Sequence, residues 1–344
     1  MEILVTGGNG FLGHNLVSAL QDRGYSTRVL ALDAEDTTWL QERNVAVYRG
    51  NILDPNTLRT PFDGVDAVFH LAAMIGVWRP MSDYFAVNVR GTENVCRAAM
   101  GTGVGRLIHV SSAMVYETSG DRPATESDPL SPLDEPYSLT KAQGDELVRR
   151  LVLDEGLPAT VIRPGTLIGP GDQLNFGRMA DRIRSGKGVV IGSGANALLL
   201  FDVADMVRGL LLALESAGAL GNVYNLGPDV PINQIEYLSI IADECGVNVP
   251  RRHVPYAALY AAAGIAERVA RITNNRIRPF VTRHGVKLYG ANNWISIAKA
   301  QAELGFEPQV RADDAVRTAC RWYFDRDTAS GSHAVAGIRT GLES

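Results

Sequence analysis

Short aliphatic runs alternate with amphipathic stretches through the first half of the chain. The candidate strands are residues 3–6, 27–32, 46–48, 67–70, 107–111 and 159–162. The stretches with apolar residues at helical spacing include 11–22, 83–100 and 138–154. Strands that alternate with helices run parallel and are joined by right-handed crossovers. The pattern therefore predicts an α/β fold with a Rossmann-type, doubly wound parallel sheet.

Glycines at positions 7, 10 and 13 follow the first predicted strand and open the first predicted helix. Gly7, Gly10 and Gly13 allow a tight turn and let backbone amides approach a pyrophosphate at the helix N-terminus. Any tight turn needs glycines, but this one stands at the start of a strand–helix series. We therefore predict a dinucleotide site here, with Phe11 and Leu12 in the same turn.

Asp33 follows the second predicted strand, twenty residues after Gly13. A carboxylate at this place can accept hydrogen bonds from both ribose hydroxyls of adenosine and would repel a 2′-phosphate. This favours NAD over NADP as the cofactor. The alternative is that Asp33 only begins the acidic turn 33–36.

Tyr137 and Lys141 lie four residues apart on a predicted helix, so their side chains share one face. A neighbouring ammonium favours the phenolate and brings the tyrosine pKa toward the working range of an acid–base group. Ser112 ends a predicted strand twenty-five residues upstream of Tyr137. Strand ends face the cofactor crevice, where a hydroxyl can bind a substrate oxygen. Ser111 is the competing serine, and a pair of serines that only caps a turn is the alternative.

Composition narrows the class of protein. The 344 residues are 46% apolar and 21% charged, with a formal net charge of −5, so nothing indicates a nucleic-acid partner. Cys96, Cys245 and Cys320 are far apart and lack metal-ligand spacing, so we expect no metal site. The chain opens directly on an apolar strand and has no stretch long enough to span a bilayer, and we expect a cytoplasmic protein.

The second half of the chain is less regular, with Gly and Pro concentrated at 164–172 and 186–194. We expect residues 1–165 to form an NAD-binding domain, to which 201–226 and about 286–297 return. A smaller, discontinuous α/β substrate domain is expected from 166–200, 227–285 and 298–326. Residues 327–344 are rich in small and polar residues and are predicted to be a loose tail.

Residues 251–290 hold eight Lys or Arg against the single acid Glu267. Within this segment, 255–272 is predicted to be a basic amphipathic helix. Such a helix is typical of peripheral membrane contact or of an anionic ligand. The alternative is a solvated positive face packed on an acidic neighbour.

Together these motifs resemble the extended short-chain dehydrogenases/reductases, the NAD-dependent epimerase/dehydratase superfamily. The matching elements, in the family's order, are TGGNGFLG (6–13), HLAA (70–73), NVRGT (88–92), SSAMVY (111–116), YSLTK (137–141), RPGTLIGPG (163–171), DVADM (202–206) and KAQAELGF (299–306). The resemblance implies that Tyr137 is the acid/base, that Lys141 binds the nicotinamide ribose, and that Ser112 polarises the carbonyl.

The resemblance also implies further cofactor contacts. These are Asn51, Ile52, Leu71, Ala72, Ala73, Asn88 and Pro164. Asn51 stands where the family usually has Asp, so the contact with adenine is altered. Asn88 is expected to brace the active-site backbone, and His70 to be a structural residue at a strand end.

Two features predict the substrate class: a missing arginine and the sequence of one loop. Nucleotide-sugar members carry an arginine before their DVxD motif, but residues 197–202 contain no cation. The loop Gly76-Val77-Trp78 is more like that of the 3β-hydroxysteroid dehydrogenase branch. The predicted substrate contacts are Trp78, Met114, Leu198 and Arg283. An apolar pocket of this kind suits a hydrophobic, steroid-like or acyl substrate.

The predicted reaction is the reversible oxidation of a secondary alcohol to a ketone on this small-molecule substrate. Two alternatives remain open: a nucleotide-sugar 4-epimerase or dehydratase, and a non-catalytic NAD-sensing protein. The resemblance also implies a homodimer, formed through the predicted helices at 83–100 and 138–154.

Overall fold

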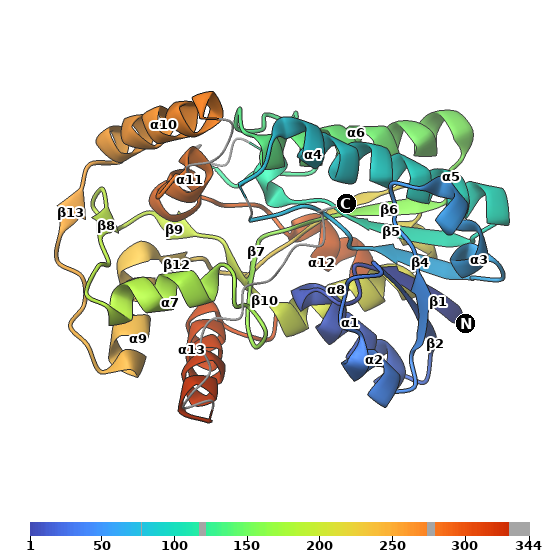
Figure 1. The fold of residues 1–344 in the computed structure, drawn as a ribbon, viewed down its shortest axis with the longest axis horizontal. Coiled ribbons are helices and arrows are strands. Elements are labelled where there is room, and N and C mark those ends of the chain that lie inside the picture. The colour runs from blue at the N-terminus through green and yellow to red at the C-terminus, as the bar shows by residue number, and fades with distance from the viewer. Residues whose placement is uncertain (77, 117–121, 274–278, 330–344) are drawn as a thin grey trace.

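Seven parallel strands form the central sheet, in the order β11-β6-β5-β4-β1-β2-β3 (Figure 1). Their bounds are β1 Glu2–Thr6, β2 Ser26–Ala31, β3 Ala46–Arg49, β4 Ala67–His70, β5 Arg106–Val110, β6 Ala159–Pro164 and β11 Val223–Leu226. The computed structural model describes residues 1–76, 78–116, 122–273 and 279–329, with backbone only for 326–329. It confirms the predicted Rossmann-type sheet, in which the strand order reverses between β1 and β4. Ligands bind beside such a reversal, at the carboxyl ends of the strands.

Helices cover both faces of this sheet (Figure 1). One face carries α3 Arg59–Phe62, α4 Met81–Phe85, α5 Thr92–Thr102 and α6 Pro136–Glu155, and the other carries α1 Phe11–Asp22, α2 Thr38–Glu42, α8 Val203–Glu215 and α12 Ala298–Leu304. Alternation along β1 shows why both faces are covered. Ile3 and Val5 pack into the core with α1 and α8, while Leu4 packs into the core with α5 and α6.

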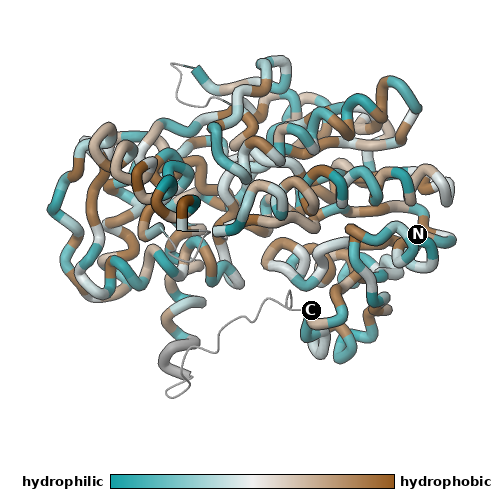
Figure 2. The backbone as a smooth tube through the Cα atoms, turned by 45° about the horizontal axis from the view of Figure 1, so that its top comes forward, coloured by the Kyte–Doolittle hydropathy of each residue, from teal (hydrophilic) through white to brown (hydrophobic). Residues whose placement is uncertain are grey.

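A second lobe lies beside the sheet (Figure 1). It contains three two-stranded sheets, which pair β7 Thr166–Ile168 with β10 Leu200–Asp202, β8 Val190–Ile191 with β13 His253–Val254, and β9 Ala197–Leu198 with β12 Ile232–Asn233. Its helices are α7 Phe176–Arg184, α9 Gln234–Cys245, α10 Tyr256–Ile272, α11 Arg283–Gly290 and α13 Ala312–Ala329. Along the helices of both lobes, apolar and polar residues alternate (Figure 2). None of the helices in the described ranges is long and apolar enough to cross a membrane.

The predicted helix at 83–100 is interrupted. Between α4 and α5 the chain forms a π-helical segment, Ala86–Gly91, that contains the buried Asn88. The Asn88 carboxamide accepts a hydrogen bond from the Met74 amide at 2.8 Å and donates one to Thr140 Oγ1 at 3.0 Å. Insertions of this kind are frequent at functional sites. Here the insertion directs one polar side chain at the backbone that follows β4.

The lobes divide the chain differently from the prediction in three places. Helix α11 packs on α10 and β8 in the second lobe, so the return to the sheet begins after it, at the bridge between Ile295 and Ala124. Helix α12 packs on β11 and α8, in the large lobe rather than the substrate lobe. Helix α13 continues to Ala329, so 327–329 are helical and not tail. The rest of the predicted tail, 330–344, lies outside the described residues, as does Val77.

A buried ion pair joins β6 to α6. Arg163 donates to both carboxylate oxygens of Asp145, at 2.8 and 2.6 Å, and both side chains are fully buried. The guanidinium also donates to the Tyr116 hydroxyl, which in turn donates to Asn225 at 2.9 Å. Every group in this network therefore has a partner, as buried charges require.

Candidate active site

A cavity of about 1390 Å³ opens at the carboxyl ends of the central strands. Its walls come from the turn after β1, the segments after β4, β5 and β6, and helices α7 and α11 of the second lobe. Both lobes therefore contribute to one site, at the edge of the sheet where the fold predicts ligand binding.

The turn after β1 is packed too closely to admit side chains at its glycines. A Cβ atom at Gly13 would lie 2.3 Å from the Gly7 carbonyl oxygen, and one at Gly7 would lie 2.7 Å from the Ala72 amide nitrogen. Gly7 has a φ of +73°, which favours glycine. Among the described residues no side chain caps α1, which starts after Gly10 at the cavity wall. Such a turn and helix N-terminus fit the pyrophosphate of a dinucleotide.

Most of the predicted cofactor residues lie in the cavity wall. They are Gly7, Gly10, Phe11, Leu12, Gly13, Asn51, Ile52, Leu71, Ala72, Ala73, Tyr137, Lys141 and Pro164. Asn51 also holds its own turn, because its Oδ1 accepts a hydrogen bond from the Leu53 amide at 2.9 Å. Asn88 is not among the described residues of the wall and braces the backbone behind it instead.

In the turn after β2, the acid that lines the cavity is not the one that was predicted to bind adenosine. Asp33 is exposed just after β2 and is not among the described residues that line the cavity, whereas the half-buried Glu35 does line it. Burial raises the pKa of Glu35, although hydrogen bonds and the charge of Arg49 act against this. The turn 33–36 thus presents its second carboxylate to the cavity rather than its first.

Tyr137, Lys141 and Ser112 meet at the inner end of the cavity. Tyr137 and Lys141 stand one turn apart on α6, whose first turn is capped by Glu135. Ser112 follows β5, and its Oγ accepts a hydrogen bond from the Met114 amide at 3.1 Å. The Lys141 ammonium donates to the Val110 carbonyl at 2.7 Å, which fixes it against the sheet.

Burial is the largest influence on the pKa values of Tyr137 and Lys141. It raises the pKa of Tyr137 to about 12, the Glu135 charge acts in the same direction, and the hydrogen bond with Ser112 opposes it. Burial lowers the pKa of Lys141 to about 8, against the charge of Asp145. Tyr137 therefore holds its proton near neutral pH. Burial sets the direction of the shift in the pKa of Tyr137, and Lys141 is not among its causes, so the predicted lowering by Lys141 stays a prediction.

His70 serves the structure beneath this site. Its Nδ1 is 2.8 Å from Thr6 Oγ1 and its Nε2 is 3.0 Å from Thr92 Oγ1, so both ring nitrogens are engaged. Burial lowers the pKa of His70 to about 3, and the nearby charge of Lys141 acts in the same direction. The ring is thus neutral and ties β4 to β1 and α5.

Two of the four predicted substrate residues lie in the cavity wall, Trp78 and Met114. Leu198 does not, because it is 1% exposed and packs into the core of the second lobe opposite Ile232 of β12. Its neighbour Leu199 points the other way and lines the cavity. Of these two leucines, only Leu199 contributes to the cavity wall.

Arg283 is also absent from the described residues of the wall. Its guanidinium donates to Glu267 at 2.8 Å and to the Asp134 carbonyl at 2.8 Å. Arg283 therefore connects α10, α11 and the loop before α6, and does not line the cavity as predicted. Its sequence neighbours Thr282 and His284 face the cavity instead.

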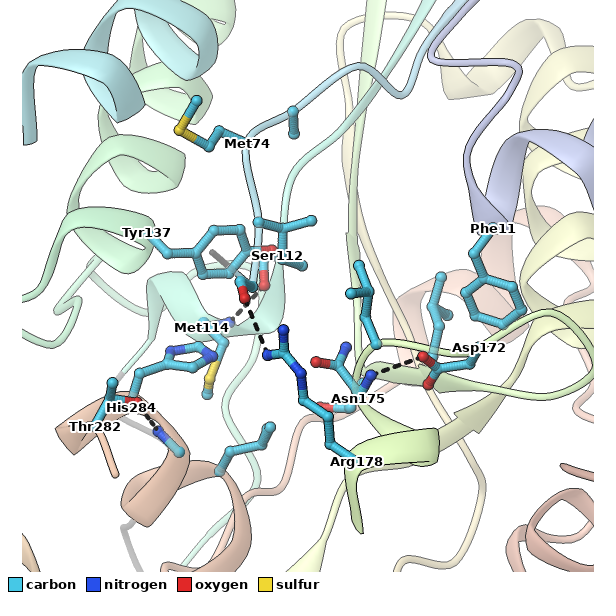
Figure 3. A pocket seen from close by; sticks show the side chains of 18 of the residues that line it. Phe11, Met74, Ser112, Met114, Tyr137, Asp172, Asn175, Arg178, Thr282 and His284 are labelled. Atoms are coloured by element: carbon cyan, nitrogen blue, oxygen red, sulfur yellow. Dashed lines mark hydrogen bonds between the residues drawn. The ribbon is translucent and has the colours of Figure 1, made fainter. Parts of the chain in front are cut away.

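The wall residues that were not predicted include Glu135, Arg178 and His284. Figure 3 shows Arg178 and His284 approaching Tyr137 and Ser112 from different elements of the second lobe. The sequence signals were weak. Neither His284 nor Arg178 has a characteristic spacing from Tyr137 in the sequence.

The fold and the site together define a dinucleotide-dependent oxidoreductase with a Rossmann domain. The NAD dependent epimerase/dehydratase family matches residues 3–227. The 2-alkyl-3-oxoalkanoate reductase of Stenotrophomonas maltophilia is 30% identical, over 92% of this chain and 98% of that protein. A 3 beta-hydroxysteroid dehydrogenase/Delta 5-->4-isomerase of Mycobacterium tuberculosis is 30% identical, over 94% of this chain and 90% of that protein. The crystal structure of DesIV, a dTDP-glucose 4,6-dehydratase from Streptomyces venezuelae with NAD bound, superposes with a TM-score of 0.78. It is 27% identical, and the superposition covers 96% of this chain and 98% of that one.

The chain belongs to the NAD-dependent epimerase/dehydratase family, within the extended short-chain dehydrogenases/reductases. It is an NAD-dependent enzyme, and the predicted similarity to the 3β-hydroxysteroid dehydrogenase branch is confirmed. Its relatives are named as reductases and dehydrogenases, which argues against the alternative of a protein that only senses NAD.

Proposed function

We propose that this enzyme interconverts a secondary alcohol and a ketone on a hydrophobic substrate, steroid-like or acyl. The observation that carries the proposal is the cavity itself. Its inner end holds Tyr137 and Ser112, and beyond them its walls include Trp78, Met114 and Leu199. A cavity with mainly apolar walls and a few polar groups beside Tyr137 suits a substrate with an oxygen function on a hydrocarbon body.

The proposed chemistry assigns one task to each side chain. Bound NAD supplies the hydride acceptor or donor. Ser112 and Tyr137 bind the substrate oxygen, and Tyr137 gives its proton to that oxygen in reduction and takes it back in oxidation. Lys141 is proposed to bind the nicotinamide ribose.

A substrate panel tests the proposal. With NAD⁺, hydroxysteroids and 3-hydroxyacyl compounds should yield NADH, which is followed by its absorbance. Epimerisation of a UDP- or dTDP-sugar without oxidation of any panel member would contradict the proposed substrate class. It would support the alternative in which the hydride returns to the same substrate.

The adenosine end permits a second prediction, on cofactor preference. We propose that Glu35 contributes with or in place of Asp33, because Glu35 lines the cavity. Glu35→Ala should raise the ratio of kcat/KM for NADP⁺ to that for NAD⁺ by about tenfold, the scale of one charge–charge contact near a protein surface. Asp33→Ala is the matched control and should change the ratio less. If Asp33→Ala changes this ratio more than Glu35→Ala does, Asp33 is the residue that discriminates between the two cofactors.

Two proposals concern surfaces. We propose that α10 makes peripheral membrane contact, since Ile265 and Ile272 are 62% and 82% exposed beside Arg268 and Arg271. Phe280, which is 71% exposed, lies at the cavity wall. A homodimer through α5 and α6 is also proposed, and these helices lie side by side on one outer face (Figure 1).

A further inference from the structure

Two side chains that can carry positive charge converge on the reacting end of the cavity. Arg178 extends from α7 and His284 from α11, and both point toward the space in front of Tyr137 and Ser112 (Figure 3). We propose that Arg178 and His284 form an anion subsite, which binds a carboxylate that the substrate carries on the carbon next to its reacting carbon. This inference rests on the proposed function and narrows its substrate class to hydrophobic 3-hydroxy and 3-oxo acids.

Arg178 is available to a ligand. Its guanidinium makes one long hydrogen bond, at 3.3 Å to the Gly76 carbonyl, and has no ion pair among the described residues. Asp172, an acid of the same wall, accepts hydrogen bonds from the amides of Asn175 and Phe176 at 2.9 and 3.2 Å. Asp172 thus caps α7 and leaves the guanidinium's donors for another acceptor. A planar guanidinium binds a carboxylate with two parallel hydrogen bonds.

Glu135 holds His284 in place. The Glu135 carboxylate accepts hydrogen bonds from the Tyr137 and Ser138 amides at 2.9 and 2.7 Å, and its Oε1 is 3.2 Å from His284 Nδ1. The same carboxylate therefore caps the helix that carries Tyr137 and orients the imidazole. When both ring nitrogens are protonated, Nδ1 donates to Glu135 and Nε2 is left to donate to a ligand.

The distance from the reacting group fixes where the carboxylate is attached. The rings of His284 and Tyr137 meet edge to face, with centroids 5.5 Å apart. A substrate whose oxygen is bound by Tyr137 therefore has its neighbouring substituent beside His284. A carboxylate placed there would also lie near the negative Glu135, so a second cation is needed to make its binding favourable. Arg178 supplies this charge from the opposite wall.

The test compares 3-hydroxydecanoic acid with its methyl ester, which keeps the chain and removes the charge. With NAD⁺ bound, calorimetry of the Tyr137→Phe protein gives the affinity for each without turnover, and NADH formation by the unmodified enzyme gives kcat/KM. We expect the acid to be preferred at least about tenfold in both measurements, the effect of one hydrogen bond between charged groups. Arg178→Gln and His284→Gln should each bring the acid-to-ester ratio toward one.

Arg184→Gln is the matched control. Arg184 lies on the same helix but pairs with Asp181 at the surface, so its loss removes the same charge from α7 and should keep the ratio. Equal affinity for acid and ester, no binding of either, or a preference that survives both substitutions would overturn the subsite. If the acid and its methyl ester are oxidised equally well, the subsite is overturned but the proposed function is upheld. A clear binding preference without any NADH would uphold the subsite and count against the proposed function.

Discussion

Replacing Tyr137 with phenylalanine should lower kcat by about 10²- to 10⁴-fold, the range that a positioned general acid–base group contributes. The half-buried phenol stands in the cavity beside Ser112, and its hydroxyl is the proposed proton donor to the substrate oxygen. The ring keeps its packing against His284 in the variant, since only the hydroxyl is removed. Affinity for NAD, measured by fluorescence titration, should change little because the glycine turn is untouched.

A second tyrosine provides the control for this experiment. The Tyr25 hydroxyl contacts Glu215 at 3.4 Å on an exposed part of the large lobe, away from the cavity. Tyr25→Phe should therefore keep normal turnover. Tyr137→Phe with unchanged kcat on the best panel substrate would contradict the proposed proton transfer.

The proposed proton transfer from Tyr137 is compatible with the ionisation of the site. Burial places the pKa of Tyr137 at about 12, so the phenol is protonated at neutral pH and can donate to a carbonyl as hydride arrives. Oxidation requires the reverse, and it gains from any positive charge brought near the phenol. The ammonium of Lys141, whose pKa lies at about 8, is the protein's own source of such charge one turn away.

The central sheet could be predicted because its signals are local. Aliphatic runs of four to six residues, separated by amphipathic helices, leave few other folds. The glycine turn and the Tyr137–Lys141 pair could be predicted for the same reason, since the chemistry depends on spacing within one element. The π-helical segment at Asn88 could not, because it arises from hydrogen bonds to Met74 and Thr140, which are distant in the sequence.

The substrate side of the cavity depends on packing between elements. Strand β9 has two residues, Ala197–Leu198, which is too short for alternation to show whether Leu198 or Leu199 faces inward. Arg178 and His284 belong to different helices, and only the arrangement of the second lobe brings them to Tyr137. Asp33 and Glu35 differ in orientation because of the turn after β2, which the spacing alone does not specify.

Replacing Arg163 with methionine should lower the free energy of unfolding by about 3–5 kcal/mol, the usual effect of removing one partner of a buried ion pair. Asp145 would lose both hydrogen bonds from Arg163 and keep only its ion pair with the partly exposed Arg149 at 3.2 Å, and Tyr116 would lose its charged donor. The charge of Asp145 also acts to raise the pKa of Lys141 against burial, so the same change would affect a residue to which the proposed function assigns cofactor binding. Urea denaturation followed by circular dichroism measures the effect.

The double variant Arg163→Met with Asp145→Leu separates two contributions to the loss of stability. One is the lost interaction between Arg163 and Asp145, and the other is the cost of the buried carboxylate that remains in the single variant. It should recover much of the stability, because removing both charges also removes the desolvation of the carboxylate left behind. Arg97→Met is the surface control, since Arg97 pairs with Glu155 in solvent and its loss should shift the urea midpoint little. An Arg163→Met protein as stable as the original would mean that Asp145 becomes protonated or hydrated without penalty. The buried pair would then add nothing to holding α6, with Tyr137 and Lys141, against β6.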